Sequence, residues 1–216
     1  MTRTRYVERD GCMFFCFDGL DGVGKTTQIE LFLAWLQESG RPFVKCQDPG
    51  STPLGEAIRK ILLGHDVAIS RISEMLLFMS ARAQLVEEVI KPALDAGQIV
   101  VSDRYLLANV VYQGHAGGLN VDTIRDIGQV ATQGIMPDLV FLLDMPPKAA
   151  ADRIDRERDR MESQGAAFEE RLRQGFLSEA ARDRDHVVVI DATQSVDVVA
   201  EQIRRAAERV LLAPRP

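Results

Sequence analysis

The sequence lacks a long hydrophobic run and has no excess of positive charge. None of its apolar stretches approaches the roughly 20 residues that a helix needs to cross a bilayer. The first residues, 1–11, are polar and lack the apolar stretch of a signal peptide. Lys and Arg number 26 against 32 Asp and Glu, a net charge of −6, which disfavours nucleic acid and anionic membranes as main partners. We therefore expect no membrane and no nucleic-acid partner, and any anionic substrate must be met by local arginines.

Cysteine is also scarce, with only three residues in the chain. Cys16 and Cys46 lie in apolar runs that predict buried strands, and no second Cys or His pair accompanies Cys12 and Cys16 to complete a metal site. An odd number of cysteines in such places is typical of reduced structural thiols. The composition thus favours a cytoplasmic protein.

Short apolar runs alternate with longer helical patterns along the whole chain. This order predicts an α/β fold, a five-stranded parallel sheet with helices on both faces. A length of 216 residues suits one domain, which we expect at 13–212 after a flexible N-terminal tail at 1–12. The strands are predicted at Met13–Asp18, Phe43–Cys46, Ile99–Ser102, Leu139–Leu143 and Val187–Ile190. Ligands of such sheets bind beyond the carboxyl ends of the strands.

A complete phosphate-loop motif, G-x-x-x-x-G-K-[ST], follows the first predicted strand and precedes a helical pattern. Its glycines allow consecutive backbone N–H groups to curl around a polyphosphate. In this motif the lysine reaches the β- and γ-phosphates, and the Ser or Thr hydroxyl binds Mg²⁺. We predict that the phosphates of ATP are bound by Gly19, Gly22, Gly24, Lys25, Thr26 and Thr27, and that Thr26 and Asp103 hold Mg²⁺, partly through water.

Two further segments carry candidate functions. Residues 70–96 read as a long helix with a kink at Pro92, and its broad apolar side predicts a subunit interface. Arg82 lies within this apolar pattern. Residues 153–165 are dense in both charges. Two interpretations are open, a solvated helix and a mobile lid that brings arginines to the transferred phosphate. The presence of a phosphate loop in the chain favours the lid.

A phosphate loop alone does not define the reaction. A GTPase would need an Asn-Lys-x-Asp motif, which the chain lacks, and a motor or transport ATPase would need further signatures and domains. Two readings remain, a small-molecule kinase and a nucleotide-binding regulator without transfer chemistry. Phosphoryl transfer requires positive charge near the moving group, which Lys25, Arg82, Arg104 and the arginines of 153–160 could supply.

Several motifs, in order, resemble those of thymidylate kinases. They are FDGLDGVGKTTQ at 17–28, DPGSTPLGE at 48–56, LLFMSARAQ at 76–84, DRY at 103–105, YQG at 112–114, PDL at 137–139, LLD at 142–144 and DRME at 159–162. The resemblance covers about residues 13–210. It implies the phosphate-loop nucleoside monophosphate kinase fold, phosphorylation of dTMP to dTDP by Mg·ATP, and a homodimer.

The resemblance also implies roles for individual residues. Asp21 would contact the deoxyribose 3′-hydroxyl, Phe78 would stack on thymine, and Arg82 would bind the carbonyl edge of the base. Arg104 would hold the acceptor phosphate, while Asn109, Tyr112 and Gln113 would line the nucleoside site. The catalytic set would be Lys25, Asp21, Arg104, Arg153 and Arg160, in the bacterial arrangement whose lid arginines compensate for the absence of arginine at Gly22.

Four positions depart from the family pattern on the acceptor side. Gln47 stands where the family has an arginine, Asp48 is one methylene shorter than the usual Glu, and Leu107 and Ala108 stand where many members have polar residues. These departures leave two alternatives to dTMP phosphorylation. One is a related kinase with another acceptor, such as dUMP, and the other is the weakly catalytic regulator.

Overall fold

The computed structural model describes residues 12–64, 67–155, 160–161 and 164–212. Five parallel strands form one sheet in the order β2-β3-β1-β4-β5, as predicted. The strands are β1 (Phe14–Gly19), β2 (Phe43–Gln47), β3 (Ile99–Asp103), β4 (Leu139–Asp144) and β5 (Val187–Asp191). The predicted tail at 1–12 lies outside the described residues except for Cys12, which is buried in the core.

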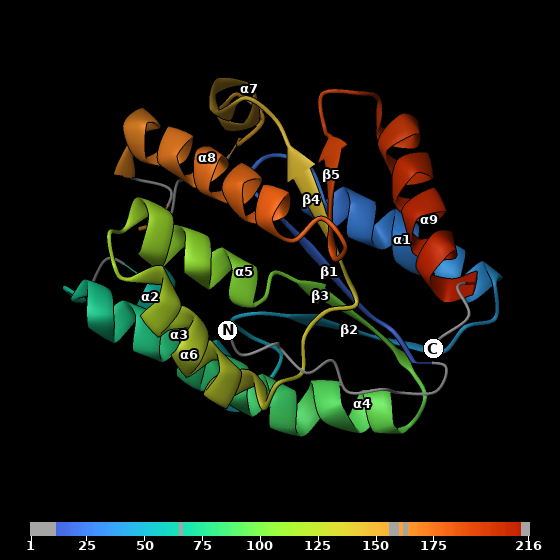
Figure 1. Cartoon of the computed structure of the whole chain (residues 1–216), viewed down its shortest axis with the longest axis horizontal. Helices are drawn as coiled ribbons and strands as arrows, with labels where there is room; N and C mark the ends of the chain where they lie inside the picture. Colours follow the sequence, from blue (N-terminus) through green and yellow to red (C-terminus); the bar gives the residue numbers. More distant parts are fainter. Residues whose placement is uncertain (1–11, 65–66, 156–159, 162–163, 213–216) are drawn as a thin grey trace.

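Helices cover both faces of the sheet. The α-helices are α1 (Lys25–Glu38), α2 (Pro53–Leu63), α3 (Arg71–Leu85), α4 (Lys91–Asp95), α5 (Leu106–Asn109), α6 (Val121–Thr132), α7 (Pro147–Ala151), α8 (Ala166–Arg182) and α9 (Val196–Leu212), and the π-helical segments are η1 (Val86–Ile90) and η2 (Val110–Ala116). Helices α1 and α9 pack together on one face, and α5 and α8 cover the other (Figure 1). No helix among the described residues is long and apolar enough to span a membrane.

Each predicted strand is present, and each ends one residue later than predicted. The sheet's backbone hydrogen bonds continue past the last apolar side chain. The N–H of Asp48 donates to Asp103 O at 3.0 Å, and that of Ala192 donates to Asp144 O at 2.9 Å. The polar residues Gln47, Asp103, Asp144 and Asp191 are therefore the last residues of their strands, held at one edge of the sheet.

The two faces of β1 bury different aromatic groups. Phe15 and Phe17 pack on Phe32 of α1 at ring-centroid distances of 5.3 and 5.6 Å. Phe14 points the other way and meets Tyr105 edge-on at 5.0 Å. Because successive side chains of a strand alternate between faces, this continuous apolar run fills the core on both sides. This packing holds β1 rigidly, and the phosphate loop begins at the end of that strand.

The helical run predicted at 70–96 is continuous but irregular. It begins with Ser70 as the N-cap, whose side chain accepts from Ser73 N at 3.2 Å, and it passes through η1 into α4. Pro92 lacks an N–H, and its ring clashes with the carbonyl four residues earlier. The π-helical turn just upstream takes up that mismatch, so the distortion begins at Val86, before the proline where the kink was predicted.

Candidate active site

The phosphate loop joins the end of β1 to the start of α1, as predicted. Gly19, Gly22 and Gly24 all have positive φ, at 132°, 83° and 98°. A Cβ at Gly19 would lie 2.4 Å from Leu143 O, and one at Gly22 would lie 2.1 Å from Ala150 O. Only glycine fits such a backbone. The loop therefore presents its amides, the start of α1 and the exposed Thr26 and Thr27 to one site.

The Lys25 ammonium is folded into this loop. It donates to Leu20 O at 2.7 Å and to Gly19 O at 3.3 Å, and it pairs with Asp21 at 3.3 Å. Burial lowers the pKa of Lys25 below its usual value, with the nearby Arg104 charge adding to the effect. The oxygens around the ammonium are of the kind that phosphate oxygens could replace.

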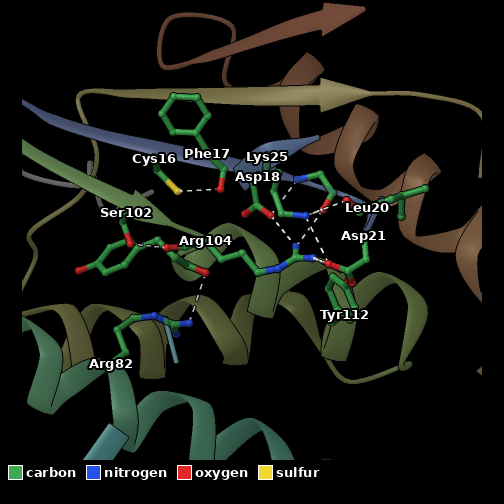
Figure 2. A network of polar contacts seen from close by, with 12 residues as sticks. Cys16, Phe17, Asp18, Leu20, Asp21, Lys25, Arg82, Ser102, Arg104 and Tyr112 are labelled. Atoms are coloured by element: carbon green, nitrogen blue, oxygen red, sulfur yellow. Dashed lines mark hydrogen bonds and ion pairs between the residues drawn. The ribbon is translucent and has the colours of Figure 1, made fainter. Parts of the chain in front are cut away.

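Arg104 is the centre of a polar network that joins the loop to β3 (Figure 2). Its NH1 donates to Asp18 Oδ1 and to Gly19 O, each at 2.9 Å. Its NH2 donates to Asp21 Oδ1 at 2.6 Å and to the Tyr112 hydroxyl at 3.2 Å. The residue has φ +67°, an uncommon left-handed conformation outside glycine. That turn directs the guanidinium from the strand end toward the loop.

The two carboxylates beside Arg104 have opposite pKa shifts. Burial raises the pKa of Asp18 to about 6, because desolvation outweighs the attraction of Arg104. Burial would also raise the pKa of Asp21, but the charges of Arg104 and Lys25 outweigh it and hold the pKa below its usual range. Asp21 is therefore ionised at neutral pH and pairs with both cations.

All of the predicted substrate-binding residues line one cavity beside the loop. They are Asp21, Phe78, Arg82, Arg104, Asn109, Tyr112 and Gln113. Ala108, one of the departures from the family pattern, lines the same cavity. Leu107 packs against the core instead. We call this cavity the acceptor pocket.

Arg82 forms the buried floor of the acceptor pocket. Its Nε pairs with Asp48 Oδ2 at 2.5 Å, and its NH1 donates to Asn109 Oδ1 at 3.0 Å. Its NH2 donates to Tyr105 O at 3.3 Å. Burial raises the pKa of Asp48 despite the Arg82 charge. NH1 also donates to Met79 Sδ at 3.1 Å, and a fully buried arginine with this many partners is fixed in position.

Arg59 is a pocket residue that the sequence analysis did not identify. It lines the acceptor pocket from α2, and its NH1 donates to Pro49 O at 3.0 Å. With its amide oxygen turned toward α2, Gln47 accepts from both terminal nitrogens of Arg59 at 3.2 Å. The sequence signal for Arg59 was its position in the helix that the Thr52 N-cap begins. Arg59 lies one helical turn after Gly55, which is buried, and so on the same side of the helix.

In this structure the two predicted lid arginines contact α2, α3 and the end of β5. Arg153 NH1 lies 3.5 Å from Ala192 O, at the end of β5. Arg160 donates from Nε to Leu62 O at 2.8 Å, and its NH2 pairs with Glu74 at 2.6 Å. Much of the predicted lid, at 156–159 and 162–163, lies outside the described residues. Arg160 is drawn to α2 and α3 because Glu74 there is a buried carboxylate that needs a cation.

Metal-binding groups are sparse at the site. Within the described part of the chain, no cluster of three or more His, Cys, Asp and Glu side chains could hold a metal ion. Single oxygen donors do meet near the loop. Asp103 pairs in register with Phe17, next to Asp18, whose Oδ2 is buried without a hydrogen bond. A protein cage for a metal is therefore absent from these residues, while donors that could complete a phosphate-bound ion are present.

Comparison with known proteins gives a consistent match. The family model described as thymidylate kinase matches residues 17–203. The thymidylate kinase of Thermosipho africanus is 42% identical over 200 residues, covering 92% of this chain and 99% of the relative. That of Bifidobacterium longum is 44% identical over 191 residues, covering 87% and 93%. A crystal structure of thymidylate kinase from Ehrlichia chaffeensis superposes with a TM-score of 0.75 at 27% identity, covering 91% of this chain and 99% of that one.

Proposed function

The chain belongs to the thymidylate kinase family and is a nucleoside monophosphate kinase, and on that premise we propose which of its residues carry out the ATP-dependent phosphorylation of dTMP. The observation that carries the proposal is the junction of two sites. Asp21 belongs to the phosphate loop and Arg104 donates to that loop; both line the acceptor pocket, and they pair with each other at 2.6 Å. A donor phosphate and an acceptor phosphate would meet at that pair.

The donor side is the phosphate loop. Gly19, Gly22 and Gly24 shape it, and Lys25, Thr26 and Thr27 face the phosphates of ATP. The Lys25 ammonium would exchange the carbonyl oxygens of Gly19 and Leu20 for phosphate oxygens. Its low exposure, 8%, means that little water competes for it, which strengthens the interaction with developing charge.

The acceptor side is the pocket between α2, α3 and η2. Phe78 would stack on thymine, with Arg82, Asn109 and Gln113 at the edge of the base. Tyr112 and Asp21 would lie along the sugar, and Arg104 would hold the acceptor phosphate. The phosphate oxygen of dTMP then attacks the γ-phosphorus of ATP, and ADP leaves. The acceptor phosphate is already ionised, so the protein supplies positioning and charge stabilisation without a general base.

Magnesium fits the donors at the loop. Mg²⁺ in kinases is held by one or two protein oxygens together with phosphates and water. We assign the Thr26 hydroxyl and the Asp103 carboxylate to it, with Asp103 partly acting through water. The bound ion would offset negative charge on the phosphates during transfer.

Arg59 is proposed to replace the arginine that the family resemblance places at position 47. Gln47 cannot bind an anion by charge, but its amide oxygen supports the Arg59 guanidinium from the pocket rim. Arg59 and Arg104 would thereby hold the acceptor phosphate from two elements, α2 and the end of β3. The pocket would thereby keep a cation for the acceptor phosphate although position 47 is Gln.

Changing Arg59 to Ala should raise KM for dTMP by about 10- to 100-fold, the loss expected for one charge-assisted contact. KM for ATP should change little, because Arg59 lines only the acceptor pocket. Steady-state kinetics with each substrate varied would measure both constants. Lys60→Ala, at the exposed neighbouring position, is the matched control. Gln47→Arg in the Arg59→Ala background should recover part of the loss. An unchanged KM for dTMP in Arg59→Ala would remove this arginine from the site.

The proposed assembly is a homodimer in the cytoplasm. Ile61 of α2 and Ile72 and Leu76 of α3 are 44%, 58% and 47% exposed, and such neighbouring apolar side chains favour burial against a second copy. The three cysteines are free and buried, in agreement with a reducing compartment. Light scattering after gel filtration should give about twice the 24.0 kDa of one chain; a 24.0 kDa species at micromolar concentration would contradict the dimer.

A further inference from the structure

Glu74 is a fully buried carboxylate with no role in the mechanism above. It lies in the first turn of α3, and its side chain is 1% exposed. Gln113 Nε2 donates to Oε1 at 2.8 Å, and Arg71 NH1 lies 3.6 Å from the same oxygen. Arg160 NH2 forms an ion pair with Oε2 at 2.6 Å, but the two groups are not aligned for a hydrogen bond. Burying a carboxylate costs free energy unless its oxygens are paired. The side chains of Gln113, Arg71 and Arg160 are therefore held close to Glu74.

A line of hydrogen bonds between buried side chains runs from Glu74 across the floor of the acceptor pocket. Gln113 Oε1 accepts from Asn109 Nδ2 at 2.5 Å. Asn109 Oδ1 accepts from Arg82 NH1 at 3.0 Å, and Arg82 Nε donates to Asp48 at 2.5 Å. All five side chains belong to residues no more than 3% exposed. Three of them, Arg82, Asn109 and Gln113, are the residues assigned to the edge of the base.

The charged groups of this line fix the orientation of both amides. A carboxylate only accepts hydrogen bonds, and a guanidinium only donates them. Gln113 must therefore turn its NH₂ toward Glu74 and its oxygen toward Asn109, which in turn directs its own oxygen toward Arg82. Turning either amide over would set two donors or two acceptors face to face. Which polar groups the amides present to the pocket thus depends on the acceptor at position 74.

Glu74 is also connected to another lining residue of the pocket, Met161, through its neighbour Arg160. Arg160 is fixed by its ion pair with Glu74 and by donation to Leu62 O at 2.8 Å. The next residue, Met161, is buried and lines the acceptor pocket. One carboxylate therefore contacts both Gln113 and the residue that precedes Met161.

We propose that Glu74 is a positioning residue that sets the base preference of the acceptor pocket, through the amide orientations of Gln113 and Asn109. The inference rests on the proposed assignment of this pocket to the nucleoside monophosphate. Thymine has a carbonyl at C4 and an N–H at N3, while cytosine has an amino group at C4 and an acceptor at N3. A pocket whose amides are held one way favours one base over the other, and a pocket whose amides can turn discriminates less.

The test is Glu74→Gln, with kcat/KM measured for dTMP and for dCMP. A glutamine at 74 can donate as well as accept, which frees Gln113 to turn over. We expect kcat/KM for dTMP to fall about tenfold and the dTMP to dCMP ratio to fall about tenfold with it. Glu88→Gln makes the same charge change at an exposed position of η1 and should leave the ratio unchanged. In a Gln113→Ala background, Glu74→Gln should no longer change the ratio.

A ratio within twofold of wild type in folded Glu74→Gln would overturn the proposal, as would a full effect in the Gln113→Ala background. If the single variant is unstable, Glu74→Gln/Arg160→Gln leaves no buried charge unpaired at the ion pair and is expected to show the same tenfold loss of ratio. Failure of the site assignment looks different, because Arg59→Ala and Arg104→Gln would then leave KM for dTMP unchanged.

Discussion

Replacing Lys25 with alanine is expected to lower kcat about 10²- to 10³-fold, the effect of removing one preorganised donor from a developing negative charge. In this structure the ammonium is held within the phosphate loop by Leu20 O at 2.7 Å and by Asp21 at 3.3 Å. On binding ATP it would exchange the carbonyl oxygens for those of the γ-phosphate while staying within the loop. Turnover under saturating dTMP and Mg·ATP, followed by ADP release, measures the loss.

Stability should fall little in the same variant. Asp21 keeps its contact with Arg104 at 2.6 Å when the ammonium is gone, so no carboxylate is left without a cation. A thermal melt separates a folded, inactive protein from an unfolded one. Lys45→Ala removes an exposed lysine from β2 and should retain full turnover. A kcat within threefold of wild type in Lys25→Ala would exclude the lysine from the transfer step.

Arg104→Gln should have the largest effect on the acceptor side. The guanidinium faces both the loop and the acceptor pocket, and its loss removes up to two charge-assisted contacts to a phosphate. At 1.5–3 kcal/mol each, these predict that kcat/KM for dTMP falls about 10²- to 10⁴-fold. KM for ATP should change far less. Tyr112→Phe, which removes only the hydroxyl 3.2 Å from Arg104, should cost about tenfold or less.

Arg104→Gln should also destabilise the fold, and a second substitution tests the reason. Asp18 is fully buried, and its pKa is already raised to about 6 with Arg104 beside it. Losing the cation leaves that carboxylate without its nearest charge partner, which is costly. Asp18→Asn in the Arg104→Gln background should restore the melting temperature without restoring activity. Recovery of activity in the double variant would show that Arg104 acts by supporting the loop alone.

The strands and the phosphate loop could be predicted because their signals are local. A buried parallel strand reads as a continuous apolar run, and the loop motif at Gly19 to Thr26 has a fixed spacing. The ends of the strands were placed one residue early because the sheet's hydrogen bonds involve the backbone and extend to polar residues such as Asp103. The π-helical turn at Val110 carried no recognised sequence signal, and Pro92 predicted a kink without showing that it would take the form of a π-helical turn at Val86.

The parts of the site that could not be predicted depend on partners far away in the sequence. Glu74 has the pattern of an ordinary acidic residue in the first turn of a helix, and only the fold reveals its contacts with Gln113 and Arg160. Arg160 was predicted beside the transferred phosphate from its charge-rich neighbourhood. In the structure it pairs with Glu74, a contact that the sequence could not predict because the burial of that carboxylate is a tertiary property.

The most direct test of the account is an acceptor comparison with the wild-type protein. ADP formation from Mg·ATP would be followed with dTMP, dUMP, dCMP, dGMP and AMP, each over a concentration range, because discrimination between substrates is expressed in kcat/KM. We expect the highest kcat/KM for dTMP, with the other acceptors at least about tenfold lower. This expectation would be contradicted by a protein that binds ATP but forms no ADP in response to dTMP, or by one that prefers another monophosphate.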